Sequence, residues 1–229
     1  MERFFDAVVF DAGGVLVLPD PLVIAPVLAP FGADVSVPSL VRAHYGAMAL
    51  QDRGAVPDDW SLYCDGYVTV AGVAAGRRAQ AAASLHAVWS AFLWRFPIAS
   101  SLRALHELSV LSVPMGVVSN AVGQIEDCLR YQGICQVGQG SGVPVAVIVD
   151  SEVVGLRKPD PAVFGHALAV LGVTPARCLY VGDSIRNDVD GARAAGLEPV
   201  LVDPYDDHPD ADCRRVRQLT ELMTLLSTA

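Results

Sequence analysis

The sequence has 229 residues, of which 52% are apolar and 18% are charged. This composition excludes a disordered chain and predicts one large α/β domain, or a main domain with a smaller insertion. A net charge of −9 argues against nucleic acid as a partner. It leaves room for a small phosphorylated ligand, because a few local cations can outweigh the global charge.

The cysteines and the start of the chain predict a soluble, cytoplasmic protein. The cysteines are scattered, odd in number and form no Cys-x-x-Cys pair, which favours a reducing compartment; they are Cys64, Cys128, Cys135, Cys178 and Cys213. The first residues carry Glu2 and Asp6 instead of a basic stretch, so we expect no secretory signal. No apolar run reaches the length of a membrane span, so we expect no membrane partner. No pattern indicates an oligomeric state.

Apolar runs alternate with helical patterns outside residues 20–96. The runs that predict strands cover 7–10, 115–118, 145–149, 178–181 and 199–202. Periodic segments predict helices at about 102–108, 122–131, 161–171, 188–195 and 216–226, and a glycine-rich loop is expected at 133–144. Continuous Val, Ile and Leu strands between helices indicate a parallel sheet covered on both faces, which is an α/β, Rossmann-like fold.

Residues 20–96 have little strand character and show three helical stripes of apolar side chains. The stripes are Val41, Tyr45, Met48 and Ala49; Trp60, Tyr63, Tyr67 and Val70; and Ala81, Leu85, Val88, Trp89 and Phe92. We interpret their aromatic members as the core of a helix bundle. The sequence thus predicts a core domain at 1–19 and 97–229, with a helical domain inserted at 20–96.

The segment 179–188 carries two acids that point to a metal site. A short apolar strand ends at Gly182 and Asp183, and Asp188 follows five residues later at the start of a helix. In open α/β sheets, ligands bind at the carboxyl ends of the strands. Carboxylates there suit Mg²⁺, which needs only one or two of them beside phosphate oxygens. A turn aspartate followed by a helix-capping aspartate would give the same pattern.

Three further residues, Asp11, Ser119 and Lys158, fall at predicted strand ends or in a strand–helix loop. Each alone also fits a structural role, as a turn residue, a helix cap or a solvated lysine. Together with the two acids they make up a phosphoryl-transfer site. A carboxylate can attack phosphorus, while a hydroxyl and helix-start N–H groups hold the phosphate oxygens. A lysine offsets negative charge, and Mg²⁺ bridges carboxylates and phosphate.

Four motifs in chain order resemble those of the haloacid dehalogenase superfamily of hydrolases, most of whose members are phosphatases. The matching segments are Phe-Asp-Ala-Gly-Gly-Val-Leu at 10–16, Val-Val-Ser-Asn at 117–120, Gly-Leu-Arg-Lys-Pro-Asp-Pro at 155–161 and Gly-Asp-Ser-Ile-Arg-Asn-Asp at 182–188. The resemblance covers nearly the whole expected core. The helical insertion resembles the cap of this family, placed between the first and second motifs.

The resemblance implies which residues act on the substrate. Asp11 would be the nucleophile that forms an aspartyl-phosphate intermediate. Lys158 would steady Asp11 and the phosphate, and Ser119 and Asn120 would bind the transferring phosphate.

The resemblance also implies a Mg²⁺ cofactor. Its ligands would be Asp11, the backbone carbonyl of Gly13 and Asp183. Asp188 would act either directly or through water. The expected activity is Mg²⁺-dependent hydrolysis of a small phosphorylated metabolite.

One position departs from the family pattern. Phosphatases of the family usually have a second aspartate two residues after the nucleophile, where this chain has Gly13. A positioned acid–base group contributes about 10²–10⁴ in rate, so this change predicts a slow phosphatase. Two alternatives stay open. The protein could be a phosphate- and metal-binding regulator with little turnover. It could also be a dehalogenase, because the sequence pattern of those enzymes also lacks the second aspartate, although the enzymes need no metal.

The inserted segment is expected to determine the substrate, but it holds no further recognisable motif. Its arginines are equally consistent with contacts to an anionic substrate tail and with solvated helix faces; they are Arg42, Arg53, Arg77, Arg78 and Arg95. The histidines share no ligand-like spacing, so a zinc site is not expected.

Overall fold

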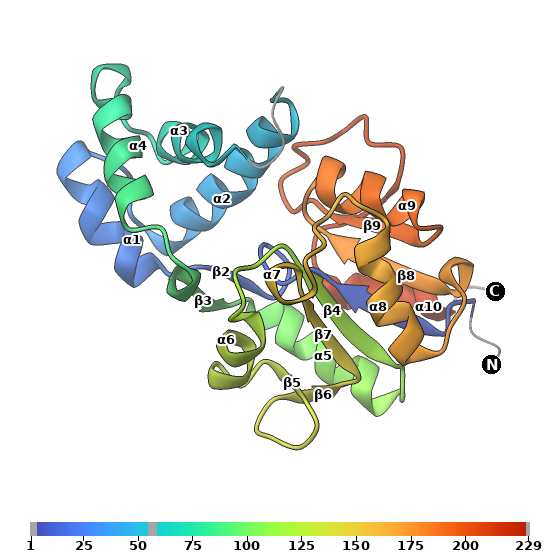
Figure 1. Cartoon of the computed structure of the whole chain (residues 1–229). Helices are drawn as coiled ribbons and strands as arrows, with labels where there is room; N and C mark the ends of the chain where they lie inside the picture. Colours follow the sequence, from blue (N-terminus) through green and yellow to red (C-terminus); the bar gives the residue numbers. More distant parts are fainter. Residues whose placement is uncertain (1–3, 55–58, 228–229) are drawn as a thin grey trace.

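A computed structural model describes residues 4–54 and 59–227. A six-stranded, all-parallel sheet forms the centre, in the order β10-β9-β8-β1-β4-β7. Its strands are β1 (Ala7–Phe10), β4 (Met115–Ser119), β7 (Val147–Asp150), β8 (Cys178–Gly182), β9 (Glu198–Val202) and β10 (Arg214–Val216). The sheet confirms the expected α/β fold (Figure 1).

Helices cover both faces of this sheet, because alternate side chains of each strand point to opposite sides. Val8 and Phe10 of β1 pack on the face that carries α5 and α10, whereas Ala7 and Val9 pack on the face that carries α8 and α9. The helices of the core are α5 (Ala99–Val110), α6 (Ile125–Tyr131), α7 (Ser151–Val154), α8 (Ala162–Leu171), α9 (Gly191–Ala194) and α10 (Leu222–Ser227), with short turns η4 (Pro175–Arg177) and η6 (Leu219–Glu221). Buried on both faces, β1 positions Asp11 at its end.

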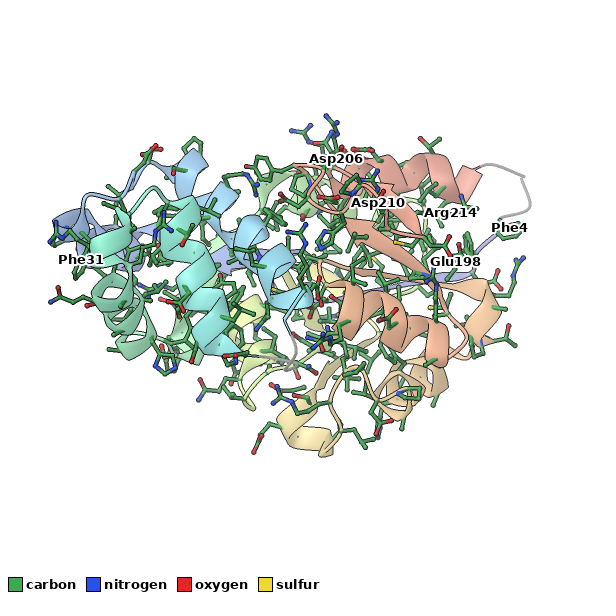
Figure 2. The ribbon with its side chains drawn as sticks, turned by 90° about the horizontal axis from the view of Figure 1, so that it is seen from above. Phe4, Phe31, Glu198, Asp206, Asp210 and Arg214 are labelled. Atoms are coloured by element: carbon green, nitrogen blue, oxygen red, sulfur yellow. The ribbon has the colours of Figure 1, made fainter. Side chains whose placement is uncertain are left out.

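Four helices follow the first strands and lie together beside the sheet (Figure 1). They are α1 (Pro21–Leu28), α2 (Val37–Asp52), α3 (Trp60–Val70) and α4 (Arg78–Ala87), with short turns η1 (Ala29–Phe31), η2 (Ala75–Arg77) and η3 (Ala91–Leu93). Their own core includes the fully buried Tyr63, Tyr67 and Leu85. Phe31 in this bundle and Phe4 beside β1 lie at opposite ends of the molecule (Figure 2).

Two short strands, β2 (Val17–Pro19) and β3 (Trp94–Pro97), connect the helices to the sheet and pair with each other antiparallel. The helical insertion expected at 20–96 begins after β2 and ends within β3. Residues 1–3, 55–58 and 228–229 of the expected domains lie outside the described residues.

Several elements differ from the sequence-based expectation. The apolar run 145–149 divides at Ala146: β6 (Val143–Val145) pairs with β5 (Cys135–Val137) in a small separate sheet, and β7 joins the main one. The expected glycine-rich loop at 133–144 therefore contains β5 and the start of β6. The third stripe is interrupted, since α4 ends at Ala87 before Val88, Trp89 and Phe92. No helix in the described part of the chain is both long and apolar enough to cross a membrane.

Candidate active site

Three neighbouring strands of the sheet deliver polar side chains to one edge. Asp11 follows β1, Ser119 ends β4 and Asp183 follows β8. Phe10 lies opposite Val117 on one side and Val181 on the other, so these strand ends are level. Because the strands are parallel, their carboxyl ends meet, and the residues predicted from distant motifs come together.

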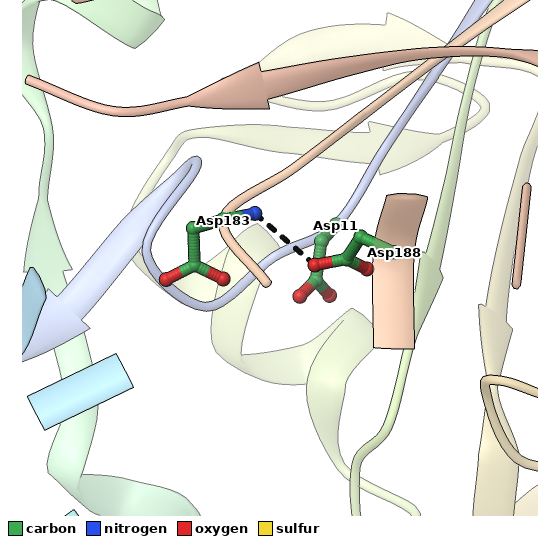
Figure 3. A group of neighbouring side chains, drawn as sticks. All are labelled: Asp11, Asp183 and Asp188. Carbon is green, nitrogen blue, oxygen red and sulfur yellow. Dashed lines mark hydrogen bonds between the residues drawn. The ribbon is translucent and has the colours of Figure 1, made fainter. Parts of the chain in front are cut away.

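Asp11, Asp183 and Asp188 form an acidic cluster at this edge (Figure 3). One carboxylate oxygen from each lies within 4.8 Å of the others. Asp188 belongs to η5 (Ile185–Asp190), a single π-helical turn. Its Oδ2 accepts hydrogen bonds from the backbone N–H of Asp183 at 3.1 Å and of Ser184 at 3.0 Å. The π-turn thus folds the second acid back onto the first.

Lys158 is the cation of the cluster. Its buried ammonium lies 3.0 Å from Asp11 Oδ1 and 2.7 Å from Asp188 Oδ1, and it donates a hydrogen bond to the Tyr180 hydroxyl at 2.8 Å. Burial alone would lower the pKa of Lys158, but Asp11 and Asp188 together raise it above its ordinary value. The lysine therefore stays charged and offsets part of the negative charge.

Three carboxylates against one ammonium leave the cluster short of positive charge. Burial, reinforced by Asp188 and Asp183 and opposed by Lys158, raises the pKa of Asp11 to about 7. Burial and then Asp188 raise the pKa of Asp183 well above its ordinary value. Hard oxygen donors with unbalanced negative charge fit a divalent cation such as Mg²⁺, whose charge would reverse these shifts.

His44 of α2 reaches into this cluster from the helical insertion. Its Nε2 lies 3.0 Å from Asp183 Oδ2, and its Nδ1 lies 2.9 Å from the Tyr63 hydroxyl. Burial, only partly opposed by Asp11, lowers the pKa of His44 to about 3, so the ring is neutral near pH 7. We assign the ring proton to Nε2, which donates to Asp183, while Nδ1 accepts from Tyr63.

The two loops that follow β4 and α7 are tied together near the cluster. The side-chain amide of Asn120 donates to the Lys158 carbonyl at 2.9 Å and accepts from the Lys158 N–H at 2.8 Å. Asp150, at the end of β7, accepts from the backbone N–H groups of Gly123 and Ile125. Asn120, expected to bind phosphate, thus uses its side chain to position the backbone of Lys158.

A cavity of about 370 Å³ opens above the cluster. All seven residues singled out from the motifs line it: Asp11, Gly13, Ser119, Asn120, Lys158, Asp183 and Asp188. From the insertion, His44, Met48 and Gln51 of α2 contribute one wall. The cavity therefore lies between the sheet edge and the inserted helices, with the predicted residues at its floor.

Gly13 and Gly14 allow this close packing for different reasons. Gly14 has φ = 67°, and a β-carbon there would collide with the Asp183 carboxylate. The φ of Gly13 is not in the left-handed region, but a β-carbon there would lie 3.0 Å from Cζ3 of Trp94. The Trp94 ring thus covers the position at which related phosphatases carry their second aspartate.

Helix α2 is held to the sheet edge by charged contacts. Asp52 accepts hydrogen bonds from the Ser184 hydroxyl at 2.6 Å and the Ile185 N–H at 2.7 Å. Arg42 makes two hydrogen bonds of 2.7 Å to Asp207, and Arg53 donates to the Asp207 carbonyl. Asp207 lies in the loop that Asp206 and Asp210 mark in Figure 2. Of the inserted arginines, these two therefore contact the core and not the cavity.

Sequence reasoning missed His44, Asp52, Tyr180 and Trp94. His44, next to Tyr45 in a helical stripe, carries no spacing signal. The sequence pattern indicated only that Tyr180 belongs to a strand, although its hydroxyl contacts both Lys158 and Asp188. The contacts of His44, Asp52 and Trp94 join residues far apart in the chain, so no local pattern marks them.

The model of the haloacid dehalogenase-like hydrolase family matches residues 5–196. A phosphoserine phosphatase from Thermus thermophilus is 40% identical over 82 residues, which are 34% of this chain and 33% of that protein. The alignments with this phosphatase and with two other relatives cover only about a third of the length of each relative.

Solved structures with the same architecture include both phosphatases and dehalogenases. The chain is similar to a phosphatase from Thermococcus onnurineus, with a TM-score of 0.60, 20% identity and coverage of 97% of this chain and 98% of that one. It is also similar to a 2-haloacid dehalogenase from Pseudomonas syringae, with a TM-score of 0.57, 22% identity and the same coverages. At this identity the likeness shows the fold alone.

Proposed function

Because the chain belongs to the haloacid dehalogenase-like hydrolases, we propose that it is a phosphatase of a small phosphorylated metabolite. The main support is the position of the Asp11 carboxylate, which lies at the cavity floor 3.0 Å from the Lys158 ammonium and beside Asp183 and Asp188. This arrangement supplies a nucleophile, a fixed positive charge and acidic metal ligands in one place.

In the proposed reaction, a carboxylate oxygen of Asp11 attacks the phosphorus atom. The bond from phosphorus to the leaving oxygen breaks, an aspartyl phosphate forms, and the leaving oxygen takes a proton from water. A water molecule then attacks the phosphorus, which releases inorganic phosphate and restores free Asp11. Lys158 orients Asp11 and offsets negative charge, while the Ser119 hydroxyl holds a phosphate oxygen.

Asp11 and Asp183, with the Gly13 carbonyl, are the proposed ligands of Mg²⁺, which when bound supplies positive charge to the carboxylates and the phosphate. Asp188 is better placed to act through water. Its Oδ1 already contacts Lys158 and Tyr180, and its Oδ2 accepts two backbone hydrogen bonds.

We propose that residues 20–96 are a cap domain on a core of 1–19 and 97–229. The cap supplies a wall of the cavity, and its contacts through His44 and Asp52 hold it over the acidic cluster. A closed cap excludes water and positions the substrate.

The five free thiols support a reducing, cytoplasmic setting.

Gly13 supports slow turnover, since Trp94 and not a carboxyl group covers it. The second candidate function, a phosphate- and metal-binding protein with little turnover, rests on this same observation. The acidic cluster argues against a dehalogenase, which needs no metal.

The test is a hydrolysis assay over a panel of phosphorylated metabolites, with Mg²⁺ and with chelator. Phosphate release that requires Mg²⁺ supports the phosphatase. No release from any substrate, together with measurable binding of inorganic phosphate, would favour the binding protein instead.

A further inference from the structure

All three tryptophans of the chain, Trp60, Trp89 and Trp94, line the cavity above the acidic cluster. Their rings form a continuous row. Trp94 lies against Gly13, Trp89 lies 5.6 Å from Trp94 between ring centroids, and Trp60 lies 4.7 Å from Trp89. The row therefore begins at the loop that carries Asp11 and leads away from it.

Apolar side chains of the core line the same cavity as this row. Val122, Ile125 and Cys128, from the loop after β4 and from α6, line the same space, as does Met48 of α2. Among the lining residues, the permanent cations are Lys158 at the floor and the solvent-exposed Arg157. Apart from Arg157, no arginine or lysine among the described residues lines the cavity above its floor to hold a second anionic group.

Gln51 adds one polar group to this wall. The residue is only 6% exposed, and its Nε2 has no hydrogen-bond partner among the described residues. A buried donor left without a partner is costly, so a ligand that brings an acceptor would satisfy it. This unmatched donor, like the aromatic row, indicates that the cavity is built to hold a molecule.

We propose that the substrate is a phosphate monoester whose leaving group is aromatic or otherwise bulky and apolar. This inference rests on the proposed phosphatase function and specifies its substrate class. The phosphate would lie at the floor with Asp11 and Lys158, and the leaving group would lie against Trp94 and Trp89. Small polar esters would leave this wall uncovered.

The packing of the rings favours an apolar group over an organic cation. Aromatic residues that bind a quaternary ammonium surround it with separate ring faces. Here Trp60 and Trp89 contact each other at 4.7 Å, and Trp89 meets Trp94 edge-on at 86°. The rings therefore form a wall and not a cage.

The first experiment compares kcat/KM for 2-phenylethyl phosphate, ethyl phosphate and phosphocholine in Mg²⁺. All three are alkyl esters, so differences in leaving-group reactivity are small. Burial of the phenyl ring should raise kcat/KM about ten- to a hundredfold over ethyl phosphate. Equal values for these two esters, or a preference for phosphocholine, would overturn the substrate class and leave the phosphatase function standing.

Matched variants test whether the tryptophan row causes the preference for the phenylethyl ester. Trp89→Leu should lower the ratio of phenylethyl to ethyl turnover by about tenfold or more. Phe92→Ala is the control, because Phe92 is a nearby aromatic residue that is 64% exposed and does not line this cavity. The ratio should stay unchanged in this control; an equal fall in both variants would contradict the assignment.

A binding measurement separates this inference from the phosphatase proposal. Because every tryptophan lines the cavity, intrinsic fluorescence reports its occupation directly. 2-Phenylethylphosphonate, which cannot be hydrolysed, should bind about tenfold or more tightly than ethylphosphonate. Tight binding without hydrolysis of any ester would retain the ligand class and reject the phosphatase. No preference between the phosphonates would reject the ligand class.

Discussion

The Trp94 ring lies over Gly13, so that a β-carbon at position 13 would come within 3.0 Å of the indole. The missing aspartate is therefore not a simple deletion, because an aromatic side chain occupies the space beside it. Restoring the acid requires that the ring shift by a few tenths of an ångström.

This relationship predicts that Gly13→Asp alone gives little gain, whereas Gly13→Asp with Trp94→Ala gives a clear one. Relative to Trp94→Ala alone, the double variant should hydrolyse ethyl phosphate about ten- to a thousandfold faster, since a positioned acid protonates the leaving oxygen. Steady-state kinetics in Mg²⁺ measure the gain. If the double variant folds and binds Mg²⁺ without any gain, the acid is not what the site lacks.

Asp11→Asn should reduce hydrolysis to background, because the substitution keeps the shape and removes the attacking charge. Asp6→Asn is the matched control: the same chemical change at an exposed carboxylate that pairs with Arg177 should leave the rate unchanged. Phosphate release under saturating Mg²⁺ is the readout. Residual activity within about tenfold of wild type would point to direct attack by water.

Asp183→Asn should have opposite effects on stability with and without Mg²⁺. Without the metal, the variant should melt no lower than wild type, because it relieves repulsion from Asp188 in a buried cluster. With Mg²⁺ at about a hundred times its Kd, wild type should gain about 2.7 kcal/mol and the variant much less. Thermal melts with metal and with chelator test this, and a wild-type melting temperature that ignores Mg²⁺ would contradict the site.

Asp52→Asn should weaken the contact between α2 and the segment that carries Asp188. Burial alone would raise the pKa of Asp52, but the nearby His208 and hydrogen bonds from Ser184 and the backbone outweigh it and lower that pKa. A carboxyl with a lowered folded-state pKa stabilises the fold above its unfolded pKa, and the effect disappears as pH falls through the folded value.

The expected loss at pH 7 is about 1–3 kcal/mol in the free energy of unfolding, the cost of removing a charged hydrogen-bond acceptor. Denaturant melts of wild type and Asp52→Asn should differ by this amount at pH 7 and begin to converge as pH falls below about 4. A difference that persists unchanged at pH 3 would show that the charge of Asp52 does not hold this contact.

The parallel sheet could be predicted because each buried strand is a continuous apolar run, as in the segment that ends at Asp183. Its edge strand β10 could not, since only Val216 of this strand is buried and it carries two exposed arginines. Trp89 was assigned to a helical stripe, but the helix ends at Ala87, two residues before it. Periodicity does not reveal where a helix stops when no glycine or proline marks its end.

The floor of the candidate site could be proposed from the sequence because its residues lie in four short motifs, three of which stand at the carboxyl ends of the neighbouring strands β1, β4 and β8. The contacts of His44 and Trp94 could not, since they depend on how the inserted helices lie over the core. The bonds from the Asn120 side chain to the backbone of Lys158 could not be predicted either, since the motif gives only the residue and not its partner.

The position of β1 also affects the order in which the chain can fold. This strand lies between β4 and β8, whose residues begin at 115 and 178, so both of its neighbours are synthesised long after it. The inserted helices pack mainly on helices close in sequence, α2 on α3 and α3 on α4, and such local contacts form early. We therefore expect the helical segment to fold during synthesis while the first strand still exposes both edges. The acidic cluster would then be completed only after residue 188 has left the ribosome.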